Sequence, residues 1–354
     1  GVWIMAYTTI DKSSDYFETK LYTGNGGTQS ITGLDFSPAW VWIKSRSNGT
    51  EHSQFDVPRG ATKMIASSTS EFEQTVANML TSFNSDGFSL GSYSSVNGNG
   101  YSQVSWNWKG GTTSGIATNG TTTITPSAYS FDQTSGFSVI KYTGNGVDGA
   151  YLPHGLGVSP QVMIVKRLTD NGHSWYMYHV ALGNQKYMQL NTANGVSGTD
   201  GMWGSFTPTS VNMKMSNDAQ IGVSSKNYIM YCFAEKKGFS KFGSYTGNGS
   251  TNGSYIHLGF SPACVIMKCS SSGSTPWLIW DNKRPGYNLT NLRIRPNTAD
   301  DEDTSTADPV DLLSNGFKCR GSNDDSNKSG SSYIYMAFAE SPFVSSTGIP
   351  TPAR

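Results

Sequence analysis

Two glutamates, Glu235 and Glu340, end matching apolar segments and are the first candidates for acid–base chemistry. Hydrolysis of a glycosidic bond uses two carboxylates that flank one cleft. On a strand, nearby residues share a face at spacings of two or four, and the expected strands contain no such carboxylate pair. Lys109 takes the equivalent place in the first part of the chain. We therefore interpret both glutamates as solvated charges and predict that the protein is not an enzyme.

The histidines offer little more for catalysis, and we expect them in loops or at strand ends, as polar surface residues. His173 and His179 would share a strand face, but no nucleophile or carboxylate accompanies them. Proton transfer needs such a partner within hydrogen-bond reach. Ser174 is not enclosed by the G-x-S-x-G pattern of a nucleophile elbow. The complete set is His52, His154, His173, His179 and His257.

Metal-ligating residues are also poorly patterned. The acidic run that contains Asp300, Asp301 and Asp303 could offer clustered oxygens to Ca²⁺, but it lacks the EF-hand spacing. We favour a solvated acidic loop, because runs of like charge are usually exposed. The cysteines form no C-x-x-C pair, so they indicate individual thiols without a zinc site. They are Cys232, Cys264, Cys269 and Cys319. We expect no metal and no cofactor.

Aromatic side chains are the stronger candidates for ligand contact, since sugars bind in part on flat aromatic faces. Trp175 and Trp277 occupy corresponding positions at the edges of loops, and Trp203 lies in a Gly-rich loop. We select these three as surface residues for a ligand. Four other tryptophans fall in strands where large apolar residues recur, so we assign them to the core; they are Trp40, Trp42, Trp106 and Trp108.

A threefold repeat supplies the elements that position these residues. The sequence Tyr-Thr-Gly-Asn-Gly starts at Tyr22, Tyr142 and Tyr245, with spacings of 120 and 103 residues. Each copy is followed by Ser-Pro and by an apolar run that ends in a lysine, where we expect the strand to reach solvent. The lysines are Lys44, Lys166 and Lys268. A unit of this size is a small domain, and ligand recognition should be sought where the copies differ.

Each copy is best explained by short antiparallel strands. An aromatic segment with period two precedes the Gly-Asn-Gly turn, and the apolar run after Ser-Pro indicates a central strand covered on both faces. Asp86-Gly87 and Asn315-Gly316 predict two-residue hairpins of type I′. Six or more short strands per copy, with turns every 8–12 residues, are typical of sandwiches and jelly rolls. The fold class is therefore all-β, with three tandem antiparallel β-sandwich domains.

The repeat also sets the expected boundaries. Residues 1–110 form the first unit, 137–238 the second, and 239–354 the third with a C-terminal tail. The intervening residues 111–136 are rich in Thr, Ser and Gly and predict a linker that separates the first unit from a rigid second and third pair. Met5 could be a natural start, with residues 1–4 an addition.

The composition excludes some partners. Charged residues are 14% of the chain and the formal net charge is zero. Binding to nucleic acid or to an anionic membrane needs a basic excess, and no apolar run is long enough for a membrane-spanning helix. We expect neither nucleic-acid binding nor membrane insertion.

The repeated motif, together with Ser85–Gly91 and Tyr333–Glu340, resembles a tandem-repeat domain of unknown function. That domain is found in phages and in viral, especially marine, metagenomes. The resemblance implies a concanavalin-like sandwich fold and a non-enzymatic virion protein of a tail fibre, spike or other surface appendage. Such a protein would be assembled in the host cytoplasm, would contact other virion proteins and itself, with a trimer as one option, and would attach to host-surface glycan. The alternatives are a carbohydrate-binding module array and, less favoured, a glycan depolymerase.

Overall fold

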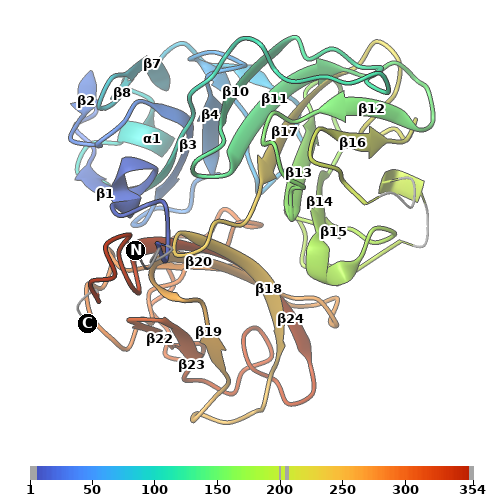
Figure 1. Ribbon diagram of the computed structural model, residues 1–354. Helices are drawn as coiled ribbons and strands as arrows, with labels where there is room; N and C mark the ends of the chain where they lie inside the picture. The colour runs from blue at the N-terminus through green and yellow to red at the C-terminus, as the bar shows by residue number, and fades with distance from the viewer. Residues whose placement is uncertain (1–5, 199–200, 204–206, 351–354) are drawn as a thin grey trace.

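The computed structural model describes residues 6–198, 201–203 and 207–350, so the expected start at Met5 lies outside the described residues. The described chain is nearly all β, with antiparallel sheets and a few single helical turns. Figure 1 shows three lobes, one for each unit, arranged around a common centre. No helix among the described residues is long and apolar enough to cross a membrane.

The first unit contains a larger and a smaller sheet. The larger sheet has the order β1 (Phe17–Thr23), β9 (Ser102–Lys109), β3 (Pro38–Ser45) and β4 (Ser53–Asp56). The smaller sheet has the order β2 (Gln29–Ile31), β8 (Gly87–Leu90) and β7 (Leu80–Asn84). The remaining elements are the pair β5 (Lys63–Met64) and β6 (Gln74–Thr75), the helix α1 (Ser94–Asn97) and the 3₁₀ turn η1 (Ser13–Asp15).

The second and third units repeat this plan. In the second, the larger sheet runs β10 (Ala128–Asp132), β11 (Phe137–Thr143), β17 (Asn227–Phe233), β13 (Val162–Arg167), β14 (Trp175–His179) and β15 (Met188–Gln189), and β12 (Ala150–Pro153) pairs with β16 (Asn212–Met215). Its 3₁₀ turns are η2 (Val180–Leu182) and η3 (Gly201–Trp203). In the third, β18 (Ser240–Thr246), β24 (Ser332–Pro342), β20 (Phe260–Cys269) and β21 (Trp277–Asp281) form one sheet, and β19 (Tyr255–His257), β23 (Gly316–Cys319) and β22 (Val310–Leu313) form the other.

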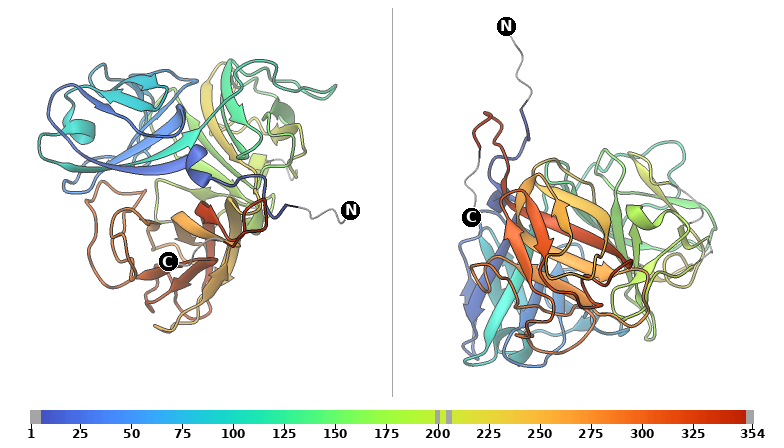
Figure 2. Two further views of the ribbon diagram at one scale, coloured as in Figure 1. Left: turned by 60° about the vertical axis from the view of Figure 1, so that its left-hand side comes forward. Right: turned by 90° about the horizontal axis from the view of Figure 1, so that it is seen from below.

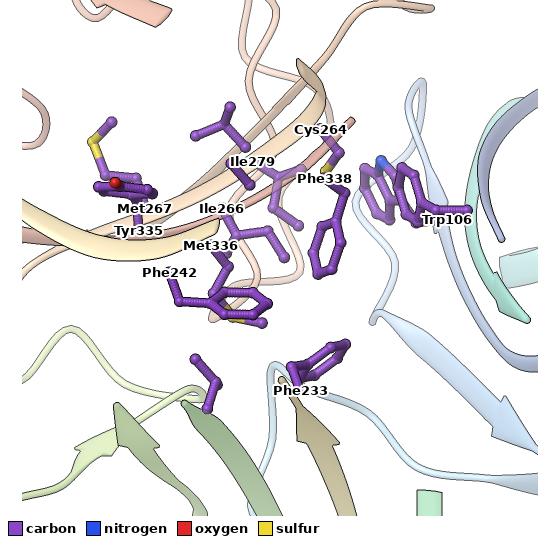
Figure 3. Packing of buried hydrophobic residues seen from close by; sticks show 14 of the residues in the cluster. Trp106, Phe233, Phe242, Cys264, Ile266, Met267, Ile279, Tyr335, Met336 and Phe338 are labelled. Carbon is purple, nitrogen blue, oxygen red and sulfur yellow. The ribbon is translucent and has the colours of Figure 1, made fainter. Parts of the chain in front are cut away.

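Each larger sheet is covered on both faces. In the first unit the outer face packs against the smaller sheet in a cluster that includes Val41 and Phe88. The inner faces of all three larger sheets meet in one shared hydrophobic core, and Figure 3 shows Trp106, Phe233 and Phe338 from the three units converging there. Double coverage explains the uninterrupted apolar runs of β3, β13 and β20, whose residues are all buried. The predicted central strand is confirmed.

The first unit does not stand apart from the other two. Its Trp40 stacks on Tyr231 of the second unit with ring centroids 4.3 Å apart, and its Phe17 stacks on Phe338 of the third at 5.2 Å. The expected linker 111–136 also differs, because its residues 128–132 form β10, the edge strand of the second unit's larger sheet. We expected a linker to separate the first unit from the second and third. Instead, apolar contacts join the first unit directly to both of the others.

The two predicted hairpins are present, but their turn type was wrong. The register pairs Asn84 with Gly87 and Leu313 with Gly316, so Ser and an acidic or amide residue form each two-residue loop. Neither loop contains a non-Gly residue with positive φ, which a type I′ turn requires at both positions. The glycines serve close packing instead. A Cβ atom on Gly87 would lie 1.9 Å from the carbonyl oxygen of Ile31 in the neighbouring strand.

The Tyr-Thr-Gly-Asn-Gly motif locks one loop of its own unit. In the first unit Tyr22 Oη donates a 2.7 Å hydrogen bond to the carbonyl of Val96, and Asn97 Nδ2 donates to Asn25 Oδ1. A side chain at Gly24 would collide with the backbone of residues 97 and 98, since its Cβ would approach the carbonyl of Gly98 to 2.2 Å. The three copies of the motif are thus explained by folding.

Candidate functional site

The structure buries the two corresponding tryptophans that we had selected as surface residues. Trp175 Nε1 donates a 2.8 Å hydrogen bond to the carbonyl of Ala66 in the first unit. Trp277 Nε1 donates a 2.9 Å bond to the carbonyl of Gln189 in the second unit. Both side chains are fully buried, so neither can present a face to a sugar. Each one anchors its unit to the preceding unit, because an indole joins a large apolar body to one polar N–H.

Trp203 is also buried. It lies in η3 and packs edge-on against Tyr178 with ring centroids 6.1 Å apart. The Gly-rich sequence around Trp203 suggested an open loop, but the side chain fills the core of the second unit instead. None of the three selected tryptophans is therefore a surface ligand contact.

His52 completes a ring of contacts between units. Trp42 Nε1 donates to His52 Nδ1 at 2.8 Å, so Nε2 carries the proton and donates to the carbonyl of Arg295 in the third unit at 3.0 Å. His52 is the positional equivalent of Trp175 and Trp277. Trp175 pairs with Lys166 and Trp277 with Lys268. His52 stands opposite Lys44, one residue beyond the pair Ile43 and Ser53. Unit one contacts three, three contacts two, and two contacts one. Such head-to-tail contacts close a ring when the rotation between units allows it.

The repeated lysines are buried, contrary to our expectation that they reach solvent. Lys44 Nζ donates to the carbonyls of Ser45 and Asn48, Lys166 Nζ to the carbonyl of His173, and Lys268 Nζ to three oxygens that include the Ala193 carbonyl of the second unit. Burial lowers the lysine pKa to about 8 for Lys44, about 7 for Lys166 and about 8 for Lys268. The long apolar stem suits the double-sided packing of the strand.

A buried ion pair recurs at a second layer of the ring. Asp281 Oδ2 accepts hydrogen bonds from Arg284 Nε at 2.7 Å and from Trp106 Nε1 of the first unit at 3.1 Å. Asp56 Oδ2 accepts from Arg59 Nε at 2.5 Å and from the hydroxyl of Tyr231 of the second unit at 2.7 Å. Both carboxylates have matched donors inside the core, so neither is a free acid or base.

In the second unit the aspartate, the arginine and the donor from the neighbouring unit are all replaced by other residues. His179 stands where the other units have aspartate, Leu182 replaces the arginine, and Met336 of the third unit replaces the donor. His179 Nε2 instead donates to the neighbouring carbonyl of Tyr335 at 3.1 Å. Burial lowers the pKa of His179 to about 4, so the imidazole of His179 is neutral near pH 7. His52 and His154 are buried as well, and the expected surface role of these three histidines was wrong.

The acidic run meets arginines and forms no cation cage. Glu302 binds Arg46 of the first unit through two bonds of 2.8 and 3.0 Å, and Asp303 pairs with Arg293 at 2.8 Å. Asp300 pairs with Arg295 at 3.4 Å. The described residues include no group of three or more His, Cys, Asp or Glu side chains that could hold a metal ion. We therefore do not propose calcium binding at Asp300, Asp301 and Asp303.

The four cysteines are free and buried among the described residues, as predicted for individual thiols. Burial raises the pKa of Cys232, Cys264 and Cys319. A thiol with a raised pKa is a poor nucleophile near neutral pH. These cysteines fill the core.

The strongest candidate for ligand binding is a pocket of about 570 Å³ in the third unit. Its size lies within the range of small-molecule sites. The ends of β20, β21, β22 and β24 surround it, together with the loop between β21 and β22. The lining residues are Ser261, Pro262, Asn282, Gly286, Tyr287, Asn288, Thr290, Leu312 and Glu340.

Asn282 is the polar centre of this pocket. It is 7% exposed, and its side-chain nitrogen and oxygen have no hydrogen-bond partner among the described residues. Asp281 fixes its position, because Oδ1 of Asp281 accepts from the backbone N–H groups of Lys283 and Arg284 at 3.1 and 3.0 Å. Val57 and Val180 occupy the equivalent positions in the other units. The fold therefore does not require an amide here, and a buried amide without a partner is costly unless a ligand pairs with it.

The rim adds an aromatic ring and a charge. Tyr287 is 77% exposed, and the loop that carries it is held by Asn288, whose side chain exchanges two 2.9 Å hydrogen bonds with the backbone of Leu312. Glu340 lies 3.9 Å from Lys283 Nζ. The pocket thus combines a flat aromatic face, a donor and acceptor amide and one carboxylate that would repel anions. This arrangement suits a neutral ligand with hydroxyl groups.

The model of a domain of unknown function, DUF7483, matches residues 12–342. The chain belongs to this family. One DUF7483 match spans all three repeats, so the family's domain comprises the three repeats together. No curated protein and no solved structure matches the chain.

Only an indirect signal in the sequence pointed to this pocket. Glu340 was noted as a lone carboxylate, whereas Asn282 and Tyr287 were missed because neither belongs to a recognisable motif. The useful signal was the difference between copies: Asn282 stands where the other two copies have valine. The expectation that recognition lies where the copies differ leads to the same residues.

Proposed function

We propose that this protein is a non-enzymatic surface protein of a phage particle that attaches to host-surface glycan through the pocket of the third unit. The observation that carries the binding proposal is the buried amide of Asn282, unpartnered among the described residues, beside the exposed ring of Tyr287. A sugar ring can stack on the tyrosine while its hydroxyls accept from and donate to the amide.

The phage assignment rests on the sequence resemblance, which also implies a fold for each unit. We propose that each unit is a concanavalin-like jelly roll, supported by the two sheets that share a core in the first unit. Attachment at the particle surface implies contacts with other virion proteins and with further copies of this chain. Three units within one chain already supply a threefold arrangement for such a role.

Binding is better supported than hydrolysis. Among the described residues, Glu340 is the one carboxylate that lines the larger pocket, whereas glycosidases use a pair. Glu18 lines an adjoining pocket, but its Oε1 lies 3.1 Å from Lys20 Nζ. The buried carboxylates of Asp56 and Asp281 are paired with Arg59 and Arg284, so they are not available for catalysis.

A glycan array tests the proposal. Wild-type protein should bind a defined set of neutral glycans, and Tyr287→Ala should lose that signal. Tyr255→Ala is the matched control, because Tyr255 is 46% exposed in the same unit but does not line the pocket. Binding that survives Tyr287→Ala would contradict the site. Release of reducing ends from bound polysaccharide by wild-type protein would contradict the non-enzymatic assignment.

A further inference from the structure

A second, smaller pocket of about 220 Å³ adjoins the first at the junction of the third and first units. Asn282 and Glu340 line both pockets, so the two pockets lie side by side, and we call them together the groove. The far wall of the smaller pocket belongs to the first unit, at the start of β1 and the turn before it. Its lining residues are Ser14, Phe17, Glu18, Thr19, Ala263, Asn282, Lys283, Ala339 and Glu340.

Thr19 gives this second pocket a polar group that the fold does not use. Its side chain is 2% exposed, and Oγ1 has no hydrogen-bond partner among the described residues. The equivalent residues of the other two units are Val139 and Phe242, which are buried in the shared core. An apolar side chain therefore satisfies this position elsewhere in the ring, and the hydroxyl at Thr19 needs a different reason.

Thr19 and Asn282 share one pattern. Each is a buried polar side chain, unpartnered among the described residues, at a position where both other copies carry an apolar residue. Both line the same groove, although one belongs to the first unit and the other to the third. A buried polar group without a partner carries a free-energy cost, because it has lost its hydrogen bonds to water. One ligand that reaches both residues would remove the two costs together.

We propose that the groove binds a neutral oligosaccharide of at least two sugar units, with one ring at Tyr287 and Asn282 and the next beside Thr19 at the junction with the first unit. This inference rests on the proposed function and adds the length of the glycan and a second contact surface. Among the described lining residues, the carboxylates of Glu18 and Glu340 outnumber the one ammonium group, that of Lys283, so the site disfavours acidic sugars. Because the ligand touches two units, the gain in affinity from the second sugar depends on the closed ring.

The test is a chain-length series measured by isothermal titration calorimetry. The probes are chito-, malto-, manno- and galacto-oligosaccharides of one to four sugars. In the series that binds, the disaccharide should bind the wild-type protein at least tenfold more tightly than the monosaccharide. Thr19→Val should remove this gain and leave monosaccharide affinity unchanged. Thr23→Val on the exposed end of β1 is the matched control and should bind as wild type.

The outcomes separate the two proposals. If the wild-type protein binds but its affinity depends neither on chain length nor on Thr19, the second subsite is wrong and the proposed function stands. If Tyr287→Ala binds every probe as wild type does, the site of the proposed function is wrong. If the wild-type protein binds no probe, both fail. Ligand-free Thr19→Val should unfold at a temperature equal to or above that of wild type, because it loses a buried hydroxyl without a partner, and this result excludes a folding defect.

Discussion

The indole Nε1 of Trp106 donates a 3.1 Å hydrogen bond to Oδ2 of Asp281, which joins the first unit to the third inside the core. The hydroxyl of Tyr231 makes the equivalent 2.7 Å bond to Asp56, which joins the second unit to the first. The first and last described segments also meet, since the backbone N–H of Ser346 donates to Asp11 at 2.6 Å. Figure 2 shows these two segments, in dark blue and dark red, side by side. The repeats thus close into a ring.

Removing the donor at Trp106 should destabilise the ring. In Trp106→Phe the Asp281 carboxylate loses a buried partner, and we expect the free energy of unfolding to fall by about 1–3 kcal/mol more than loss of indole volume alone explains. Denaturant unfolding measures the difference. Trp280→Phe is the matched control, because Trp280 is equally buried but its Nε1 has no partner among the described residues. Equal losses in both variants would contradict the assigned role.

The replaced ion pair of the second unit offers a rescue experiment. His179→Asp buries a carboxylate without the arginine and the donor found in the other units, and should lower the free energy of unfolding by about 3–5 kcal/mol. Adding Leu182→Arg and Met336→Tyr rebuilds the set seen around Asp56 and should recover most of that loss. Chemical denaturation of the single and triple variants is the measurement. A triple variant no more stable than His179→Asp would refute the equivalence of the three positions.

Acid should weaken the fold through its buried histidines. Burial lowers the pKa of both His154 and His179 to about 4, below the usual 6.5. Between these values the unfolded chain binds more protons than the folded chain, so stability falls as pH decreases from about 6.5 to 4. The expected loss is on the order of 3 kcal/mol for each histidine. Unfolding titrations at several pH values should show a smaller loss for His179→Gln, while His257→Gln, at an exposed residue, should follow wild type.

Local patterns predicted the strands well. The apolar run of Trp40–Ile43 indicated a strand covered on both faces, and β3 is buried along its whole length. The hairpin at Gly87 was also found, although close approach to Ile31 explains the glycine better than a positive-φ turn does. These features depend on neighbours in the same unit, so their signals lie within short stretches of sequence.

The polar residues were harder to place because their partners lie in other units. Trp175 is anchored by a carbonyl 109 residues away, and Trp277 by one 88 residues away. A lysine or tryptophan at a strand end normally indicates solvent, and only the closed ring supplies the acceptors that bury Lys268 and these indoles. Asn282 carries no motif, so only comparison with Val57 and Val180 marks it as unusual.

The most direct test of the account is calorimetric titration of Asn282→Val with the neutral oligosaccharide that the wild-type protein binds best. Valine already occupies this position in the other two units, and the variant loses a buried amide without a partner, so the ring should fold with thermal stability at least equal to that of wild type. We predict at least a tenfold loss of affinity, because the ligand hydroxyls lose the amide that pairs with them. Val180→Ala, at the equivalent position of the second unit, should bind as wild type. An Asn282→Val protein with wild-type affinity would contradict the central claim.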